Sequence, residues 1–213
     1  MKKMILALLA TAVVAGAAAQ TNSKAKPQEV SLGGAATLAV GGVVKLSPPD
    51  LARGENIMQA LSKRQSTRVF SEKLLSLADL SDMMWAANGI NRADAGKRTA
   101  PSSRNRQDIF VYVTFAGGSF EYDHKDHTLV KVSDVDCRPD KIAPLCVIIV
   151  ANTDDSSTGI DAGLVSQNIS LFCSGVGLAT VCRSTMDRQA VSAGLKLQQG
   201  FHPILNHPVG YFK

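Results

Sequence analysis

The sequence lacks the features that mark several large classes of protein. Its four cysteines form no Cys-x-x-Cys pair and have no zinc-like spacing with histidine. After residue 19, no apolar run reaches the roughly 20 residues that a membrane-spanning helix needs. Without Lys2 and Lys3, the 23 basic residues fall to 21 against 18 acidic ones, which leaves a net charge of +3. This mild, scattered charge argues against a nucleic-acid partner.

The first 19 residues have the pattern of a signal peptide. Lys2 and Lys3 precede an uncharged apolar run, and Ala17-x-Ala19 before Gln20 fits a signal-peptidase site. We therefore expect cleavage between Ala19 and Gln20 and export, with the periplasm as the expected compartment. An uncleaved anchor is the alternative, whereas the absence of a nearby cysteine argues against a lipoprotein. Cleavage leaves 213 − 19 = 194 residues, which suits one domain.

The mature chain divides into a leader and one folded domain. Residues 20–49 are Gly-rich and weakly patterned, which is typical of an arm or linker, with a short strand expected before Pro48 and Pro49. The folded domain is expected over residues 50–213. Its first two helices, each with a capping residue at its start, are predicted at 50–63 with Asp50 and at 76–89 with Ser76.

The rest of the domain alternates between strands and helices. A polar loop is expected over residues 91–100, and Gly117-Gly118 suits a hairpin turn. Apolar patterns predict strands at 108–115, 120–122, 128–132, 145–151 and 178–183, and helices at 161–175 and 186–197. Because two strands are hairpin-linked, the pattern favours an α+β fold with a central, mainly antiparallel sheet surrounded by helices.

Three segments carry candidate chemistry. Arg64 and Arg68, four residues apart with Ser66 between them, form a compact anion site, because guanidinium forks match phosphate oxygens. The polar loop over residues 98–107 offers amide donors and acceptors that suit the pyrimidine edge of a flavin ring. The glycines before Leu178 permit close approach of a flat ligand. Taken singly, the first segment is better interpreted as a solvated turn and the second as a surface loop, and the third is not specific, because paired glycines also make tight connections.

Together the segments resemble the FMN-dependent nitroreductase family, and the likeness spans nearly the whole chain after Asp50. It is closest to the compact branch that includes peptide azoline-oxidising dehydrogenases. The motifs that carry it are Arg64-x-Ser66-x-Arg68-x-Phe70, Met84-Trp85-Ala86-Ala87-Asn88-Gly89-Ile90-Asn91-Arg92, Arg98-Thr99-Ala100-Pro101-Ser102 with Asn105 and Gln107, Asp161-x-Gly163-x-x-x-Gln167-Asn168-Ile169, Gly177-Leu178 and Val209-Gly210-Tyr211.

The resemblance implies a homodimer that binds two FMN molecules at its interface. The cofactor-binding residues it implies are Arg64, Gln65, Ser66 and Arg68 at the phosphate and the polar edge of the flavin, Pro101, Ser102 and Asn105 from the partner subunit, Gly177 and Leu178 against the ring, and Lys213 at the phosphate. The chain departs from the family at Phe212, where a proline usually follows Gly-Tyr, and this departure weakens the expectation for Lys213.

The family chemistry needs no protein base, since the flavin accepts a hydride at N5 and passes electrons to a small-molecule acceptor in the same pocket. We therefore name no catalytic residue and expect an oxidoreductase. Export would separate the protein from nicotinamide cofactors, so we expect another electron donor. The alternative is an exported flavin- or small-molecule-binding protein without turnover, and a purely structural domain is the least favoured hypothesis.

Several other residues invite a functional interpretation. His124 and His127 are expected to be solvated in a hairpin turn, because a metal site would need a third ligand. Trp85 is expected to pack in the core, with the border of a pocket as the alternative. Cys173 and Cys182 are expected to be buried thiols, while a disulfide between the two remaining cysteines is less favoured than free thiols.

Overall fold

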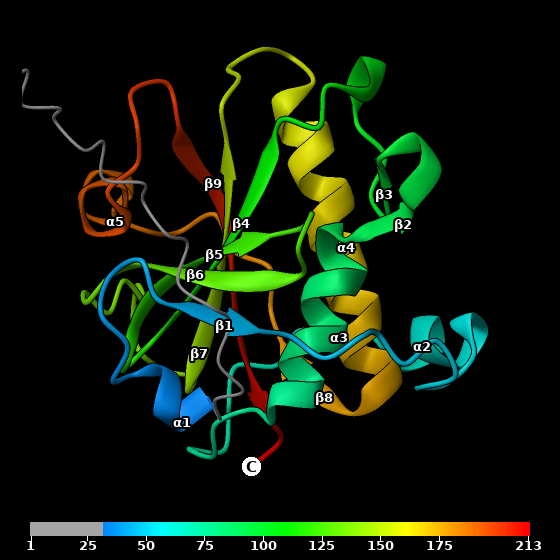
Figure 1. Cartoon of the computed structure of the whole chain (residues 1–213). Coiled ribbons are helices and arrows are strands. Elements are labelled where there is room, and N and C mark those ends of the chain that lie inside the picture. The colour runs from blue at the N-terminus through cyan, green and yellow to red at the C-terminus, as the bar shows by residue number, and fades with distance from the viewer. Residues whose placement is uncertain (1–31) are drawn as a thin grey trace, which may run out of the picture.

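A computed structural model describes residues 32–213 (Figure 1). The expected signal peptide and the first part of the arm lie outside the described residues. The described part of the arm begins with the short helix α1 (Leu32–Ala35) and continues to strand β1 (Val43–Lys45). Leu32 and Val44 are buried in the main hydrophobic core. This part of the arm therefore packs against the domain.

A seven-stranded sheet forms the centre of the fold, in the order β1-β6-β5-β4-β7-β9-β8. Each pair of neighbouring strands in this sheet is antiparallel, which confirms the predicted mainly antiparallel α+β architecture. The remaining strands of the sheet are β4 (Ile109–Phe115), β5 (Gly118–Asp123), β6 (Thr128–Ser133), β7 (Leu145–Ala151), β8 (Leu178–Thr180) and β9 (His202–Tyr211).

Strand β7 supplies the two faces of the sheet with apolar side chains. All seven of its residues are buried, as its continuous apolar run predicts. Because side chains alternate along a strand, Val147 and Ile149 enter the main core, whereas Ile148 and Val150 enter a second core. The sheet is therefore covered on both faces at its centre.

Helices form the outer layers on these two faces. Helices α3 (Leu77–Asn88) and α4 (Thr158–Val176) pack against each other on the side of the main core (Figure 1). Helix α5 (Arg188–Leu195) covers the second core, into which it places Val191 and Leu195. Helix α2 (Ile57–Lys63) packs against α4 and projects from the body of the domain. No helix within residues 32–213 is both long and apolar enough to cross a membrane.

Helix capping follows the sequence in one case and departs from it in another. Ser76 caps α3 as predicted, because its hydroxyl accepts a hydrogen bond from Asp79 N at 3.0 Å. The prediction that Asp50 starts a helix is wrong. Asn56 caps α2 instead, and its side chain accepts a hydrogen bond from Gln59 N while Gln59 reciprocates. This capping box satisfies two backbone donors at once, so the cap of α2 lies six residues after the predicted one at Asp50.

Two further elements differ from the prediction. The expected loop over residues 91–100 contains a small hairpin of β2 (Ile90–Arg92) and β3 (Lys97–Arg98). Strand β9 is the larger surprise, because Pro203 and Pro208 argue against an inner strand. The sheet tolerates Pro208 because β8 pairs only with residues 209–211, so its missing N–H interrupts no ladder there. Strand β8 is correspondingly shorter than the predicted 178–183.

The histidines of the β5–β6 turn are half-buried and bonded, not solvated. His127 contacts the hydroxyl of Tyr122 and Ser47 O, each at 2.8 Å, so it ties the turn to the arm. His124 lies 3.0 Å from the guanidinium of Arg98. Burial and the Arg98 charge lower the pKa of His124 to about 4. Both histidines thus have structural partners within the fold.

The four cysteines are unpaired. Cys173 is buried, as expected, between α4 and α3, where its thiol lies 3.9 Å from the sulfur of Met83. Cys182 is exposed, which corrects the expectation of a buried thiol. It lies between the end of β8 and Arg183, which still forms a β-bridge with Asn206 of β9.

Candidate functional site

The segment that follows α2 lies beside strand β8 and the end of β9. Thr67 N donates to Thr180 O at 2.9 Å, and Phe70 forms an isolated β-bridge with Phe212. Ser71 N donates to Tyr211 O at 2.9 Å. These contacts between residues far apart in sequence bring the predicted anion site to the C-terminal end of α4.

A cleft of about 490 Å³ opens at this place. Four of the predicted cofactor-binding residues line it: Arg64, Gln65, Gly177 and Leu178. Ser66 and Arg68 continue along the same exposed segment, and Lys213 is exposed directly after Phe212, which also lines the cleft. The structure therefore gathers the first and third predicted segments at one site.

The donors at the cleft suit an anionic ligand. Lys63 forms an ion pair with Glu55 at the rim, whereas neither Arg64 nor Arg68 has a carboxylate partner among residues 32–213. Exposed, unpaired guanidinium groups are free to bind a phosphate from solution. The residues present thus fit the phosphate of a flavin nucleotide.

Gly177 gives the cleft room for a flat ligand. It ends α4 in the left-handed region at φ 76°, which favours glycine. A Cβ atom added there would meet no described atom within 4 Å, so the space beside its backbone is open. Leu178 follows at the start of β8. An aromatic ring can therefore approach the backbone at this point.

Tyr211 helps to hold one wall of this site. Its hydroxyl donates to Asp79 Oδ2 at 2.5 Å and accepts from Ser76 N at 3.0 Å. Arg53 forms ion pairs with Asp79 and, at 2.9 Å, with Asp82. Burial alone would raise the pKa of Asp79, but hydrogen bonds from Ser76, Tyr211 and Arg53 lower it. This network ties the segment before α2 to α3 and to the end of β9.

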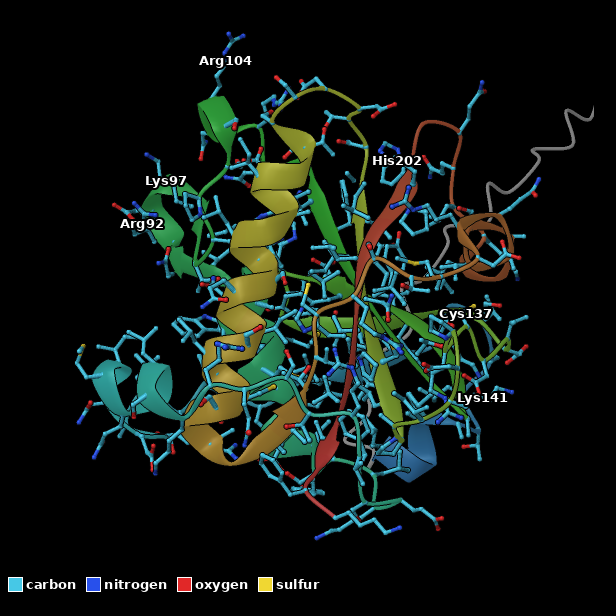
Figure 2. All side chains as sticks on the ribbon, turned by 180° about the vertical axis from the view of Figure 1, so that it is seen from behind. Arg92, Lys97, Arg104, Cys137, Lys141 and His202 are labelled. Carbon is cyan, nitrogen blue, oxygen red and sulfur yellow. The ribbon has the colours of Figure 1, made fainter. Side chains whose placement is uncertain are left out.

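The second predicted segment lies at the opposite end of α4. Ser103, in the 3-10 turn η2 (Ser103–Asn105), bonds to Asp161 in the first turn of α4. Pro101, Ser102 and Asn105 belong to the same loop, and Figure 2 shows the neighbouring Arg104 pointing away from the body of the domain. The 16 residues from position 161 to 177 span about 24 Å of helix. The loop and the cleft therefore do not form one site within a single chain.

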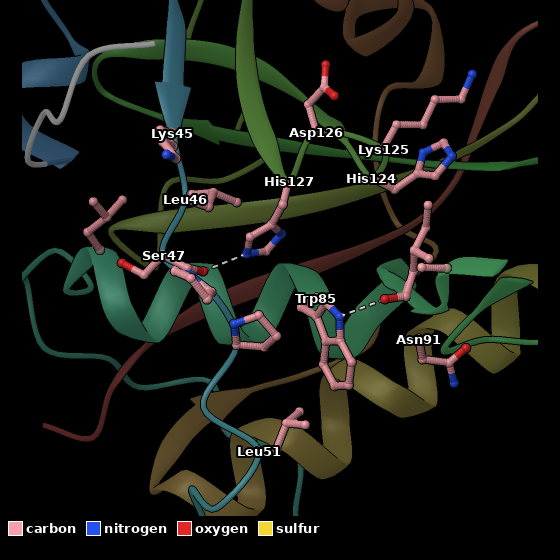
Figure 3. A pocket seen from close by; sticks show the side chains of 15 residues that line it. Lys45, Leu46, Ser47, Leu51, Trp85, Asn91, His124, Lys125, Asp126 and His127 are labelled. Atoms are coloured by element: carbon pink, nitrogen blue, oxygen red, sulfur yellow. Dashed lines mark hydrogen bonds between the residues drawn. The ribbon is translucent and has the colours of Figure 1, made fainter. Parts of the chain in front are cut away.

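A wider groove of about 1160 Å³ lies between the arm, α3 and the β5–β6 turn (Figure 3). Trp85 lines it and is half-buried, so it borders a cavity as well as packing. Its indole N–H donates to Ile90 O at 3.0 Å. None of the predicted cofactor-binding residues lines this groove. It is therefore separate from the cleft at the end of α4.

Sequence reasoning missed several residues of the cleft. Ser170, Ser174 and Thr180 also line it. Ser174 donates to Ala60 O at 2.7 Å, so its hydroxyl joins α2 to α4. The serines at 166, 170 and 174 recur every four residues, which places them on one face of a helix. That spacing was the available signal.

Comparison with known proteins identifies the class to which this site and fold belong. The model of the nitroreductase family matches residues 61–211, which is most of the chain. The chain therefore belongs to the nitroreductase family, and it is an oxidoreductase. The resemblance inferred from the sequence motifs is confirmed.

Individual relatives support this assignment. A solved structure from Ralstonia eutropha JMP134, provisionally described as a nitroreductase, is 32% identical with a TM-score of 0.76 and covers 80% of this chain and 90% of its own. A provisionally named nitroreductase of Methanocaldococcus jannaschii is 25% identical over an alignment 198 residues long, which covers 80% of this chain and 98% of that protein. An FMN-dependent nitroreductase from Clostridium difficile R20291 shares the fold, with 17% identity, a TM-score of 0.53 and coverage of 73% and 87%.

Proposed function

We propose that the protein is an FMN-dependent oxidoreductase that works as a homodimer with two shared sites. The observation that carries the proposal is the position of the two predicted cofactor-binding groups at opposite ends of α4. Within one chain they are about 24 Å apart, as the rise of an α-helix requires. A second chain in antiparallel orientation would bring the loop of one subunit to the cleft of the other.

The surface of α4 supports such a pairing. Ile160 and Leu164 are 63% and 37% exposed, and Gln167 and Leu171 continue the same stripe at spacings of three and four residues. This spacing is typical of a helix face that packs against another helix. A two-fold axis near Gln167 would place α4 antiparallel to the partner's α4 and would cover the stripe in both copies.

Each group of residues then has a defined task. Arg64, Ser66 and Arg68 bind the phosphate and the polar edge of the flavin, while Gly177 and Leu178 lie against its ring. Pro101, Ser102 and Asn105 of the partner subunit would complete the site at the ring. When bound, FMN supplies hydride transfer at N5, and the protein supplies orientation and positive charge. The acceptor is a small molecule that enters the same site.

Titration with FMN tests the proposal. Arg68→Ala removes one charge-assisted hydrogen bond, worth about 1.5–3 kcal/mol, so binding should weaken about 10- to 150-fold. Arg188→Ala, on the exposed start of α5, is the matched control and should bind FMN like the native chain. Light scattering should report twice the mass of the chain. A colourless protein after incubation with FMN, or a flavin-loaded monomer, contradicts the proposal.

We further propose that the protein is exported and does not depend on a nicotinamide donor. Lys2 and Lys3, the apolar run and Ala17-x-Ala19 support cleavage before Gln20. Mass spectrometry of the protein from fractionated cells tests the cleavage. Stopped-flow reduction tests the donor: NADH and NADPH should reduce bound flavin slowly, and dithionite should reduce it completely. Rapid, saturable reduction by either nucleotide refutes the proposal about the electron donor. The proposal that the protein is exported is then decided separately, by the cell fractionation.

A further inference from the structure

The loop over residues 101–107 has a backbone conformation that a free chain would avoid. Arg104, Asn105 and Gln107 have φ angles of 55°, 54° and 53°. The left-handed region costs an L-residue about 1–2 kcal/mol, although asparagine tolerates it better. Three such residues within four positions require contacts elsewhere that hold the loop in place.

Asp161 provides the central contact. Its side chain is 1% exposed, and its two carboxylate oxygens lie 2.9 and 3.0 Å from Ser103 N. The hydroxyl of Ser103 donates to the same carboxylate at 3.0 Å. Asp161 is not among the residues that line the cleft in its own chain. A buried carboxylate on α4 thus has the loop as its hydrogen-bonding partner.

Further bonds fix the backbone on either side of the tip. Ser102 Oγ accepts from Gln107 N at 2.8 Å, and Gln107 Nε2 donates to Gly96 O at 2.9 Å. Because the Ser102 hydroxyl accepts within the loop, its own proton is available to donate outward. At the tip, Arg104 and Asn105 are exposed, and neither side chain forms a hydrogen bond with the residues that the structure describes. The backbone is therefore fixed while the side chains are free.

A fixed backbone that presents free polar side chains is the arrangement expected of a preorganised binding element. We propose that Asp161 is a positioning residue that acts across the dimer interface: it sets the loop of its own subunit so that Ser102 and Asn105 meet the flavin of the partner subunit. This inference rests on the proposed function. Asp161 itself lies about 24 Å along α4 from Gly177, which lines the cleft of its own chain, so the loop it positions is remote from that cleft.

The single variants establish whether Asp161 matters for flavin binding. Asp161→Ala should weaken FMN binding about tenfold or more while the circular dichroism spectrum is unchanged. Asp161→Asn keeps one acceptor oxygen and should lie between it and the native chain, and it also serves if the alanine variant does not fold. The matched control is Asp187→Ala, because Asp187 accepts from Ala190 N at 2.9 Å at the start of α5, away from the loop. This control should bind FMN normally.

A mixed dimer then separates action in trans from a merely structural role. Asp161→Ala and Arg68→Ala chains with different affinity tags are co-expressed and purified on both tags. If Asp161 serves the partner's site, one site of the mixed dimer combines an intact Arg68 with an intact loop, so the dimer binds FMN with native affinity at half the native stoichiometry. If Asp161 serves its own chain's site, both sites are defective and tight binding is lost, which overturns the inference.

The failure of this inference and that of the proposed function are distinguishable. A native chain that binds no FMN refutes the proposed function itself. A native chain that binds FMN, together with an Asp161→Ala variant of equal affinity, refutes only the role of Asp161.

Discussion

Replacing Tyr211 with phenylalanine tests the network that holds the wall of the cleft. The substitution keeps the ring and removes only the hydroxyl, which donates to Asp79 at 2.5 Å and accepts from Ser76 N at 3.0 Å. Asp79 is 7% exposed, so water does not readily replace the lost donor. The variant therefore isolates one hydrogen bond to a largely buried carboxylate.

The expected loss follows from the charge on Asp79. A hydrogen bond to a charged group contributes about 1.5–3 kcal/mol to the free energy of unfolding. For a domain of this size, about 1 kcal/mol shifts Tm by 2–4 °C, so Tm should fall by about 3–12 °C. The pKa of Asp79 lies below its ordinary value of 3.8 in the folded state, so this contribution is present at neutral pH and is lost as pH falls through the folded-state value.

Urea denaturation measures the difference in unfolding free energy between the native chain and Tyr211→Phe. This difference should be the same at pH 7 and pH 5, and it should be smaller below about pH 3.8, the ordinary pKa of the Asp79 carboxyl. A double-mutant cycle with Asp79→Asn supplies the control, because the effect of Tyr211→Phe should fall when the partner carries no charge. An unchanged urea midpoint, or an equal loss in the Asp79→Asn background, would refute the reasoning.

Three further predictions concern the cleft, the buried histidine and the exposed thiol. Gly177→Ala should cost about 1–2 kcal/mol of stability, because the backbone at this position is left-handed. It should also weaken FMN binding, because the added methyl group enters the open space of the cleft. Equal FMN affinities of the native chain and the variant would contradict this prediction. Burial, with a smaller effect of the Arg183 charge, lowers the pKa of His207 to about 3, so stability should fall as pH drops below the ordinary value of 6.5. In His207→Gln the urea midpoint should depend less on pH between 7 and 5 than it does in the native chain. An equal pH dependence in the two proteins would contradict the prediction. Cys182 alone should react with a chromogenic disulfide in the folded protein, whereas all four cysteines react in urea; a second fast thiol would show that a buried cysteine is accessible.

Much of the fold was predictable because the signals in it are local. Ser76 and the apolar face that follows it define α3, since a side-chain cap and a 3.6-residue period act within one helix. The bounds of β7 agree with its apolar run because an inner strand must be apolar on both faces. The meeting of the first and third predicted cofactor-binding segments at one cleft was predictable for a different reason. Their motifs resemble those of a known family, and local patterns alone would not have brought them together.

The features that the sequence did not reveal depend on tertiary contacts. Strand β9 contains Pro203 and Pro208, and prolines normally indicate that a segment is not an inner strand. Here the pairing with β7 and β8 nevertheless places β9 inside the sheet. The start of α2 was misplaced because Asp50 and Asn56 are equally good caps in isolation. Ser174 was missed because the four-residue spacing of the serines marks one face of a helix but not the cavity that this face borders, and Thr180 has no such spacing. The connection between Asp161 and Ser103 joins residues 58 positions apart and leaves no local pattern.

The position of β9 has a consequence for biosynthesis. This strand follows every other described element in the chain, yet it lies inside the sheet, between β7 and β8. Until its residues leave the ribosome, β7 has one unpaired edge lined by a continuous apolar sequence. Such an edge is a template for association with other chains. The emerging chain is therefore expected to be prone to aggregation until β9 is made, and a stop codon before His202 should yield an insoluble product rather than a smaller, partly active domain.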